Sequence, residues 1–334
     1  MAKLKRLLPY LGAFLLGAGL IGGLVRLTDH NNVSSKAICG TTLRNTESDY
    51  KFIKPLLACD VGATVDTPSL APLKNKLTTL INSAKAAGQV SNASLYFRDL
   101  DQGDWTEING TDAYQPASLF KVPLLIAYLK IAEDHPEILG QKITVTTDST
   151  KEGGIQSIPP AQSAIFGQSY SVADLLRLMI VYSDNSAKDL LTNYVDINVL
   201  DQIFTELAIP FPNNMTSAYT LTARSYSRFF RTLYNSSYLS DPASEYALSL
   251  LSDVVYADGL RAGVPADVKI AHKFGEANIT LANGQSGQEL HDCGIVYDSH
   301  PYLICIMTRG TTADPLAKLI ATLSQTVYEF RQQK

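Results

Sequence analysis

The pattern of polar and apolar positions divides the chain into three parts, and the first is a long apolar run. Lys3, Lys5 and Arg6 precede an uncharged stretch over residues 7–25. As a helix this stretch would be about 28 Å long, close to the thickness of a bilayer core. The basic residues before it favour a cytoplasmic amino terminus. We therefore expect a cytoplasmic tip and a transmembrane signal-anchor over residues 1–26. A cleaved signal peptide is the alternative, although the run lacks a clean Ala-x-Ala site.

The second part, residues 27–67, is polar and weakly patterned, and it predicts an extracytoplasmic stalk. Cys39 and Cys59 lie within it. A disulfide between them would close a loop in an oxidising compartment and add about 3 kcal/mol of stability. The apolar run over residues 52–57 lies inside that loop and could dock on the domain that follows.

The third part, residues 68–334, has the periodic patterns of a folded domain. Leu73, Leu77, Leu80 and Ile81 recur at helical spacing, which predicts a helix over residues 70–87. Residues 93–98 and 105–109 flank a turn-rich loop and predict a β-hairpin.

The same periodicities predict the rest of the domain. Further helices are expected from residue 171 to about 182, in the stretch after residue 185, and at 198–208, 221–234, 243–255 and 315–330, with strands at 143–147, 268–275, 290–297 and 303–309. Two strands, many helices, three strands and a last helix indicate an α+β fold. We expect a five-stranded antiparallel sheet flanked by helices, beside an all-helical subdomain.

Composition excludes several classes of function. The net charge of −4 is spread over segments of mixed sign, so nothing indicates a nucleic-acid partner. Five histidines without paired spacing, and no Cys-x-x-Cys, argue against a metal site. No glycine-rich phosphate loop opens a helix, and we expect no cofactor.

A candidate nucleophile lies where a polar stretch gives way to an apolar helix. Ser118 and Lys121 are three residues apart in the run Ser-Leu-Phe-Lys, so on a helix they share a face. A serine hydroxyl reacts poorly unless a base such as a desolvated lysine takes its proton. Ser-x-x-Lys also occurs by chance, and Ser48 to Lys51 is a second match in the polar stalk without an apolar helix behind it.

Two later motifs complete an ordered set. Ser183-Asp184-Asn185 falls between two predicted helices, and Lys273-Phe274-Gly275-Glu276 ends a predicted strand. Each has a structural alternative, because Asp184-Asn185 could simply cap a helix and Lys273 could be a solvated charge.

In this order the motifs resemble those of class A β-lactamases and penicillin-binding proteins. From about residue 69 onward, the chain resembles the class A β-lactamase-related serine hydrolases, a superfamily shared with D-alanyl-D-alanine peptidases. Tyr182 before Ser-Asp-Asn, and the stretch Arg261-Ala262-Gly263-Val264-Pro265, add to the likeness. The resemblance implies a β-lactamase/transpeptidase-like fold.

The resemblance also implies a role for each residue. Ser118 would be acylated, Lys121 would be its general base or proton relay, and Ser183 would pass a proton to the leaving nitrogen. Asn185 would hydrogen-bond the substrate amide and the lysine, and Lys273 would attract an anionic substrate. The backbone N–H groups of Ser118 and Glu276 would form the oxyanion hole, with Phe274 and Gly275 beside the substrate.

Two departures from the family pattern change the expected activity. Class A β-lactamases hydrolyse the acyl-enzyme with a loop glutamate, whereas residues 207–223 contain no acid and Glu206 belongs to a helix pattern. Acylation could then proceed while hydrolysis of a β-lactam would stall. Phe274 replaces the usual threonine or serine, which puts carboxylate recognition in doubt. Glu276 adds a negative charge nearby unless it faces outward.

We therefore predict a membrane-anchored serine hydrolase of the single-pass type, with its catalytic domain outside the cell membrane. Its substrate would be a small-molecule β-lactam or a cell-wall D-alanyl peptide. A penicillin-binding sensor and a catalytically degenerate structural member are the alternatives. Cys293 and Cys305 lie on the last two predicted strands, where they could form a cross-strand disulfide or remain buried thiols.

Overall fold

The computed structural model describes residues 43–44, 49–58, 66–146, 158–211 and 219–333, which belong to the compact unit Thr41–Lys334. The predicted signal-anchor and the possible Cys39–Cys59 disulfide lie outside the described residues. Within the described ranges, no helix has both the length and the apolar character needed to span a bilayer.

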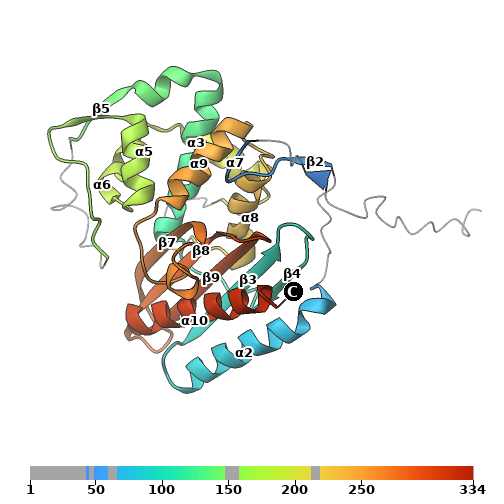
Figure 1. Cartoon of the computed structure of the whole chain (residues 1–334). Coiled ribbons are helices and arrows are strands. Elements are labelled where there is room, and N and C mark those ends of the chain that lie inside the picture. Colours follow the sequence, from blue (N-terminus) through green and yellow to red (C-terminus); the bar gives the residue numbers. More distant parts are fainter. Residues whose placement is uncertain (1–42, 45–48, 59–65, 147–157, 212–218, 334) are drawn as a thin grey trace, which may run out of the picture. The chain divides into compact units, whose positions relative to one another are not determined.

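A five-stranded antiparallel sheet is the centre of the fold, as predicted (Figure 1). Its strands are β3 (Asn92–Asp99), β4 (Trp105–Ile108), β7 (Lys269–Thr280), β8 (Ser286–Tyr297) and β9 (Tyr302–Gly310), in the order β4-β3-β9-β8-β7. The amino-terminal hairpin therefore pairs with the carboxy-terminal strands through β3 and β9. The edge strand next to the catalytic motifs is β7.

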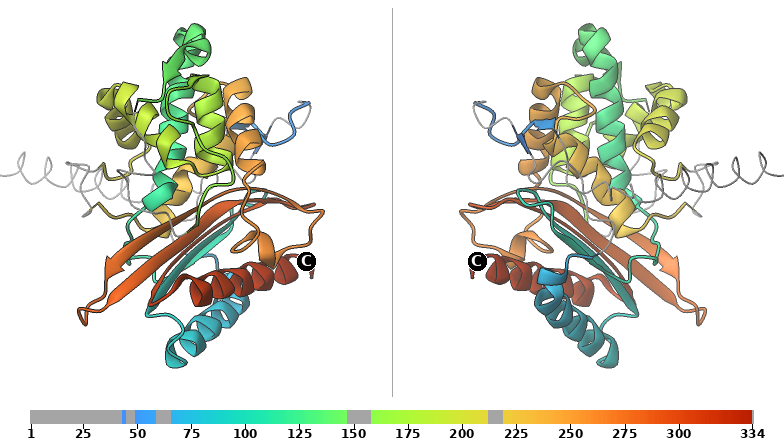
Figure 2. Two further views of the ribbon diagram at one scale, coloured as in Figure 1. Left: turned by 90° about the vertical axis from the view of Figure 1, so that its left-hand side faces the viewer. Right: turned by 90° about the vertical axis from the view of Figure 1, so that its right-hand side faces the viewer.

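Two helices cover one face of the sheet, and the helical region covers the other (Figure 2). The pair is α2 (Ala71–Ala86) and α10 (Ala313–Arg331), with the turn η1 (Pro68–Leu70) directly before α2 and the turn η4 (Arg261–Gly263) packed near α10. Because successive strand residues point to opposite faces, Ile304 and Ile306 pack with these helices while Leu303 and Met307 pack with the helical region. Both faces of the central strands are therefore buried.

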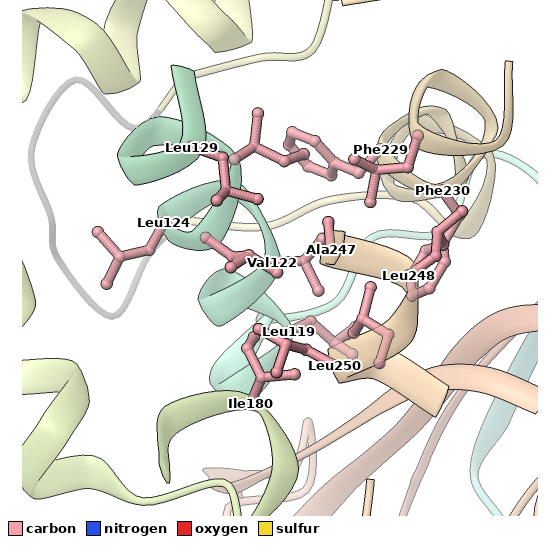
Figure 3. Close-up of a cluster of buried hydrophobic side chains, with 14 of the residues drawn as sticks. Leu119, Val122, Leu124, Leu129, Ile180, Phe229, Phe230, Ala247, Leu248 and Leu250 are labelled. Atoms are coloured by element: carbon pink, nitrogen blue, oxygen red, sulfur yellow. The ribbon is translucent and has the colours of Figure 1, made fainter. Parts of the chain in front are cut away.

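The helical region surrounds α3 (Lys121–Asp134), in which every residue from Lys121 to Leu129 is buried. Its other elements are η2 (Ala117–Phe120), η3 (Pro136–Gly140), β5 (Lys142–Thr144), β6 (Ser169–Ser171), α5 (Val172–Val181), α6 (Asn185–Tyr194), α7 (Ile197–Glu206), α8 (Ala223–Tyr234) and α9 (Asp241–Ser252). Leucine and phenylalanine side chains from α3, α8 and α9 meet around Val122 and Leu119 (Figure 3). This packing holds the start of α3 against the sheet.

The hairpin of β7 and β8 is longer than the sequence predicted. The strands reach Thr280 and Ser286, instead of ending at 275 and starting at 290. Asn278, Thr280 and Ser286 are exposed, so this end of the hairpin has no apolar alternation to reveal it. On the adjoining buried part, a disulfide joins Cys293 of β8 to its cross-strand neighbour Cys305 of β9.

Part of the predicted stalk belongs to the folded body. Phe52 and Ile53 are buried in the core of the helical region, and the Glu245 carboxylate accepts hydrogen bonds from the backbone N–H groups of residues 51, 52 and 53 at 2.9, 2.9 and 3.0 Å. Residues 54 and 56 donate to the Tyr234 and Asn235 carbonyls. The apolar run over residues 52–57 therefore docks on the folded domain, as the sequence had indicated, and residues 49–58 are not free stalk. The short strands β1 (Leu43–Arg44) and β2 (Leu56–Ala58) pair with each other here.

Truncation of Ile53 tests this docking. Ile53 is 1% exposed, so we expect I53A to lower the free energy of unfolding by about 2–4 kcal/mol. The matched control is L57A, because Leu57 lies in the same run but is 60% exposed. Urea denaturation of both variants provides the measurement. Equal stabilities would contradict the docking.

Candidate active site

Ser118 lies on η2, between the sheet and the start of α3. The α-helix begins only at Lys121, so the predicted helix start is a 3-10 turn. Ala117, just before the serine, has φ of +48°, a conformation that non-glycine residues seldom adopt. The Tyr226 hydroxyl of α8 donates to the Leu119 carbonyl at 2.9 Å and so ties the turn to that helix. Ser118 itself is half-buried.

The Lys121 amine is buried and points to the Ser-Asp-Asn motif. It donates to the Ser183 carbonyl at 2.6 Å, the Ser183 hydroxyl at 3.1 Å and the Asn185 Oδ1 at 2.8 Å. Among the described residues, no hydrogen bond joins it to the Ser118 hydroxyl, which sequence spacing had led us to expect. Burial, and secondarily the charge of Lys273, hold the pKa of Lys121 well below its usual range. Burial therefore favours the neutral form of the Lys121 amine, which is the form that can accept a proton.

A second buried amine reaches the same hydroxyl. Lys273 of β7 is 0% exposed and donates to the Ser183 Oγ at 2.9 Å and to the Phe274 carbonyl at 2.9 Å. Burial lowers the pKa of Lys273 to about 7, although Asp292 and Glu276 oppose the shift. Ser183 has φ of +58°, so its backbone is strained at the point where the two amines meet.

The junction between α5 and α6 holds Ser183 in place. Asp184 caps α6, since its carboxylate accepts from the N–H groups of Ser186 and Ala187 at 3.2 and 3.0 Å. It also accepts from the Ala164 N–H at 3.0 Å. Asp184 is thus the helix cap that we considered, while Asn185, the next residue, contacts Lys121. The motif combines one structural and two site residues.

The glycine of the third motif allows β7 to approach the nucleophile. A Cβ on Gly275 would lie 2.9 Å from the Pro116 carbonyl oxygen, closer than real Cβ atoms come, and 3.1 Å from the Ser118 nitrogen, which is also tight. Only glycine therefore fits here. This contact brings the next backbone N–H, that of Glu276, close to the Ser118 turn, where an oxyanion hole would need it.

The structure shows the surroundings of Phe274 and Glu276, the two side chains that set the third motif apart from the family pattern. The Phe274 ring is buried and stacks on Tyr256, with centroids 4.1 Å apart. Glu276 is half-buried and not turned outward: its Oε1 accepts from the Ile158 N–H at 2.7 Å.

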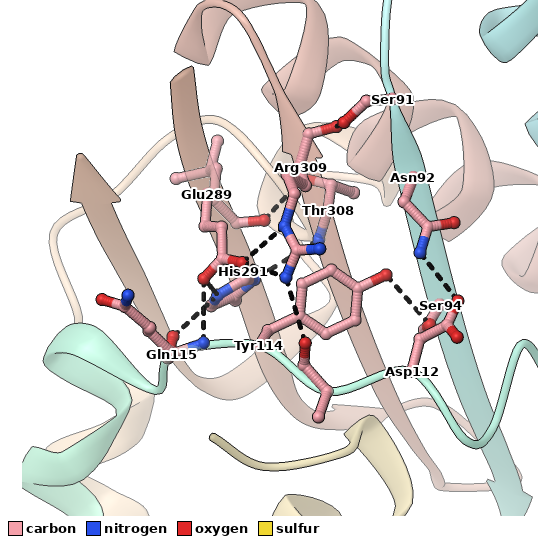
Figure 4. A network of polar contacts seen from close by, with 12 residues as sticks. Ser91, Asn92, Ser94, Asp112, Tyr114, Gln115, Glu289, His291, Thr308 and Arg309 are labelled. Atoms are coloured by element: carbon pink, nitrogen blue, oxygen red, sulfur yellow. Dashed lines mark hydrogen bonds and ion pairs between the residues drawn. The ribbon is translucent and has the colours of Figure 1, made fainter. Parts of the chain in front are cut away.

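A buried polar network that we did not predict fixes the approach to Ser118 (Figure 4). Glu289 of β8 accepts from the Gln115 N–H at 2.8 Å and from Arg309 at 2.6 Å, while His291 contacts the Gln115 carbonyl at 3.0 Å. Burial raises the pKa of Glu289, but hydrogen bonds from His291, Arg309 and Gln115 outweigh it and lower the pKa overall. A partial sequence signal was available, because Glu289 and His291 flank the apolar Leu290 on β8, but Arg309 is the only charged residue of β9.

An aromatic cluster lies at the end of α7, next to the segment over residues 207–223. Phe204 of α7 packs against Phe120, Phe211, Tyr219 and Phe229. Glu206 is exposed and accepts a hydrogen bond from Gln202. Within the described ranges, no cluster of His, Cys, Asp or Glu could hold a metal ion.

The sequence model of the β-lactamase enzyme family matches residues 72–330. The chain belongs to this family. Among curated proteins, none matches the sequence.

Solved structures share the fold. The structure of PBP-A superposes with a TM-score of 0.64 at 23% identity, covering 79% of this chain and 97% of that one. A β-lactamase from Chitinophaga pinensis gives 0.65 at 22% identity, covering 78% and 99%, and one from Xanthomonas campestris gives 0.63 at 20% identity, covering 77% and 98%. At these identities the likeness establishes the β-lactamase-like fold. Family and fold together support a serine hydrolase.

Removal of the Asp184 carboxylate tests its capping role. D184A would leave three backbone N–H groups without their acceptor, so we expect the free energy of unfolding to fall by about 2–4 kcal/mol. D189A, which removes a surface partner of Lys188, should cost less than about 1 kcal/mol. Thermal or urea denaturation compares the two, and a stable D184A would refute the assignment.

Proposed function

We propose that this protein is a membrane-anchored serine acyl-hydrolase that acts through a Ser118 acyl-enzyme on β-lactams or D-alanyl cell-wall peptides. The observation that carries the proposal is the shared Ser183 hydroxyl, which accepts from Lys121 at 3.1 Å and from Lys273 at 2.9 Å. Two lysines are buried near a half-buried serine, and each has a lowered pKa. This energetically costly arrangement is typical of proton-transfer sites.

Acylation follows from these groups. The Ser118 oxygen forms a bond to the acyl carbon, and its proton passes to the neutral Lys121 amine. The carbon–nitrogen bond then breaks, and the leaving nitrogen takes the proton of the Ser183 hydroxyl. The Lys121 ammonium reprotonates Ser183 through their hydrogen bond. The backbone N–H groups of Ser118 and Glu276 would stabilise the oxyanion, each worth about 3 kcal/mol.

Deacylation would be slow on a β-lactam. Water must add to the acyl carbon to release the acid and restore Ser118, and the residues packed around Phe204 supply no carboxylate for it. A variant of PBP-A has been solved as an acyl-enzyme complex with penicillin G. A peptidase-like or penicillin-binding role therefore fits better than antibiotic destruction. The same absence favours a penicillin-binding sensor as the second candidate.

The proposed location is the outer face of the cell membrane, with the anchor over residues 1–26. The buried disulfide between Cys293 and Cys305 supports it, because such bonds persist mainly in oxidising compartments. A degenerate structural role fits less well, because the chain has all four reactive side chains of the family motifs: Ser118, Lys121, Ser183 and Lys273.

Intact mass spectrometry after incubation with penicillin G tests the function. We expect a lasting adduct of one penicillin mass on Ser118, since acylation is supported and hydrolysis is not. S118A should show no adduct. Rapid turnover without an adduct would indicate a β-lactamase, and an adduct on S118A would exclude this nucleophile.

The pH dependence of acylation tests the two lysines. Lys121 must be neutral to accept a proton, so the rate should rise with pH through its lowered pKa. Lys273 can attract the anionic penicillin only while it is protonated. The acylation rate should therefore fall above about pH 7, where Lys273 loses its proton. In K273R the guanidinium stays charged, and the descending limb should disappear. The adduct formation rate measures both limbs. K130R, altered on the exposed side of α3, should keep both.

A further inference from the structure

The side of β7 that flanks the reacting centre carries two unexpected side chains. Residues two apart on a strand share a face, so Phe274 and Glu276 project from the same side of β7, and the Lys273 ammonium lies 4.0 Å from the centre of the Phe274 ring. Gly275 touches the Ser118 turn. Phe274 and Glu276 therefore border the place where the substrate continues beyond its reacting carbonyl.

The Phe274 position has no hydrogen-bond donor to offer a carboxylate. Its ring stacks on that of Tyr256, with centroids 4.1 Å apart, and both side chains are buried. Asp292, the cross-strand partner of Phe274 on β8, adds a buried carboxylate held by the Leu260 N–H at 2.9 Å and His272 at 2.9 Å. The nearby Arg261 donates to the carbonyls of residues 264, 265 and 268.

Glu276 retains an unused acceptor. One oxygen takes the Ile158 N–H at 2.7 Å, whereas the Oε2 is buried and has no hydrogen-bond partner among the described residues. A buried carboxylate oxygen without a donor is costly, and such groups in a native protein call for an explanation. A ligand N–H would satisfy this oxygen, and a ligand carboxylate would be repelled by it.

We propose that Glu276, with the Phe274–Tyr256 stack, is a specificity-determining element that selects acyl donors bearing an N–H group, a carboxamide or an ammonium, in place of a terminal carboxylate. This inference rests on the proposed Ser118 acyl-enzyme. It adds to that function the kind of chemical group that the substrate carries next to the scissile bond. Penicillins, which carry a carboxylate, would acylate Ser118 slowly.

Three matched donors test the inference. Each is an N-acylated D-alanyl dipeptide, ending in D-alanine, in D-alaninamide or in the aminoethylamide of D-alanine, and released amine is measured to give kcat/KM. We expect the amide or the ammonium donor to exceed the carboxylate donor by tenfold or more. The comparison of amide with ammonium tells whether the charge or the N–H alone is recognised.

Variants assign the preference to the two side chains. E276Q should reduce the preference over the carboxylate donor at least fivefold, and F274T should raise the rate of penicillin G acylation about tenfold. E206Q is the control, because Glu206 is exposed at the end of α7. This variant should rank the three donors in the same order as the unaltered protein. Thermal unfolding checks that each variant is folded.

A neutral fluorophosphonate separates this inference from the proposed function. If it fails to label Ser118, detected by peptide mass, the proposed function itself is wrong. If it labels Ser118 but the carboxylate donor is used best, all three donors are inert, or E276Q leaves the ranking unchanged, the function stands and the selectivity is refuted.

Discussion

Everything at the site depends on two lysine amines that share one serine hydroxyl inside the protein. Two ammonium groups so close in a low-dielectric interior repel each other, and each also loses its hydration. The lowered pKa values of Lys121 and Lys273 follow chiefly from burial, to which the charge of Lys273 adds at Lys121. The fold holds them there by joining an edge strand, a central helix and a strained turn at Ser183.

The main parts of this arrangement could be predicted because each has a local signal. Ser118 and Lys121 lie where polar sequence meets a buried helix, and Lys273 follows the apolar residues Ile270 and Ala271 of β7. Their meeting could not be derived from spacing, because Lys121 donates to Ser183 and Asn185, whereas helical geometry had pointed it to Ser118. The family resemblance, which carries information about tertiary structure, supplied that relation.

The features that sequence reading missed depend on distant partners. Docking of the apolar run over residues 52–57 was expected, but its partners were not, because Glu245, which accepts from the N–H groups of residues 51–53, is 193 positions from Phe52. The Glu289 network joins two strands and the segment before Ser118. The exposed end of the β7–β8 hairpin is stabilised by backbone pairing, so side-chain pattern does not mark it. In each case the partner, rather than the segment itself, determines the structure.

The disulfide has a consequence for how the chain must mature. Cys293 and Cys305 are 0% exposed in the paired strands β8 and β9, and Cys293 lies directly opposite Lys273. An oxidant can reach these sulfur atoms only before the helical region closes over the sheet. The compartment in which the polypeptide folds therefore determines whether Cys293, the cross-strand neighbour of Lys273, is a thiol or part of a disulfide.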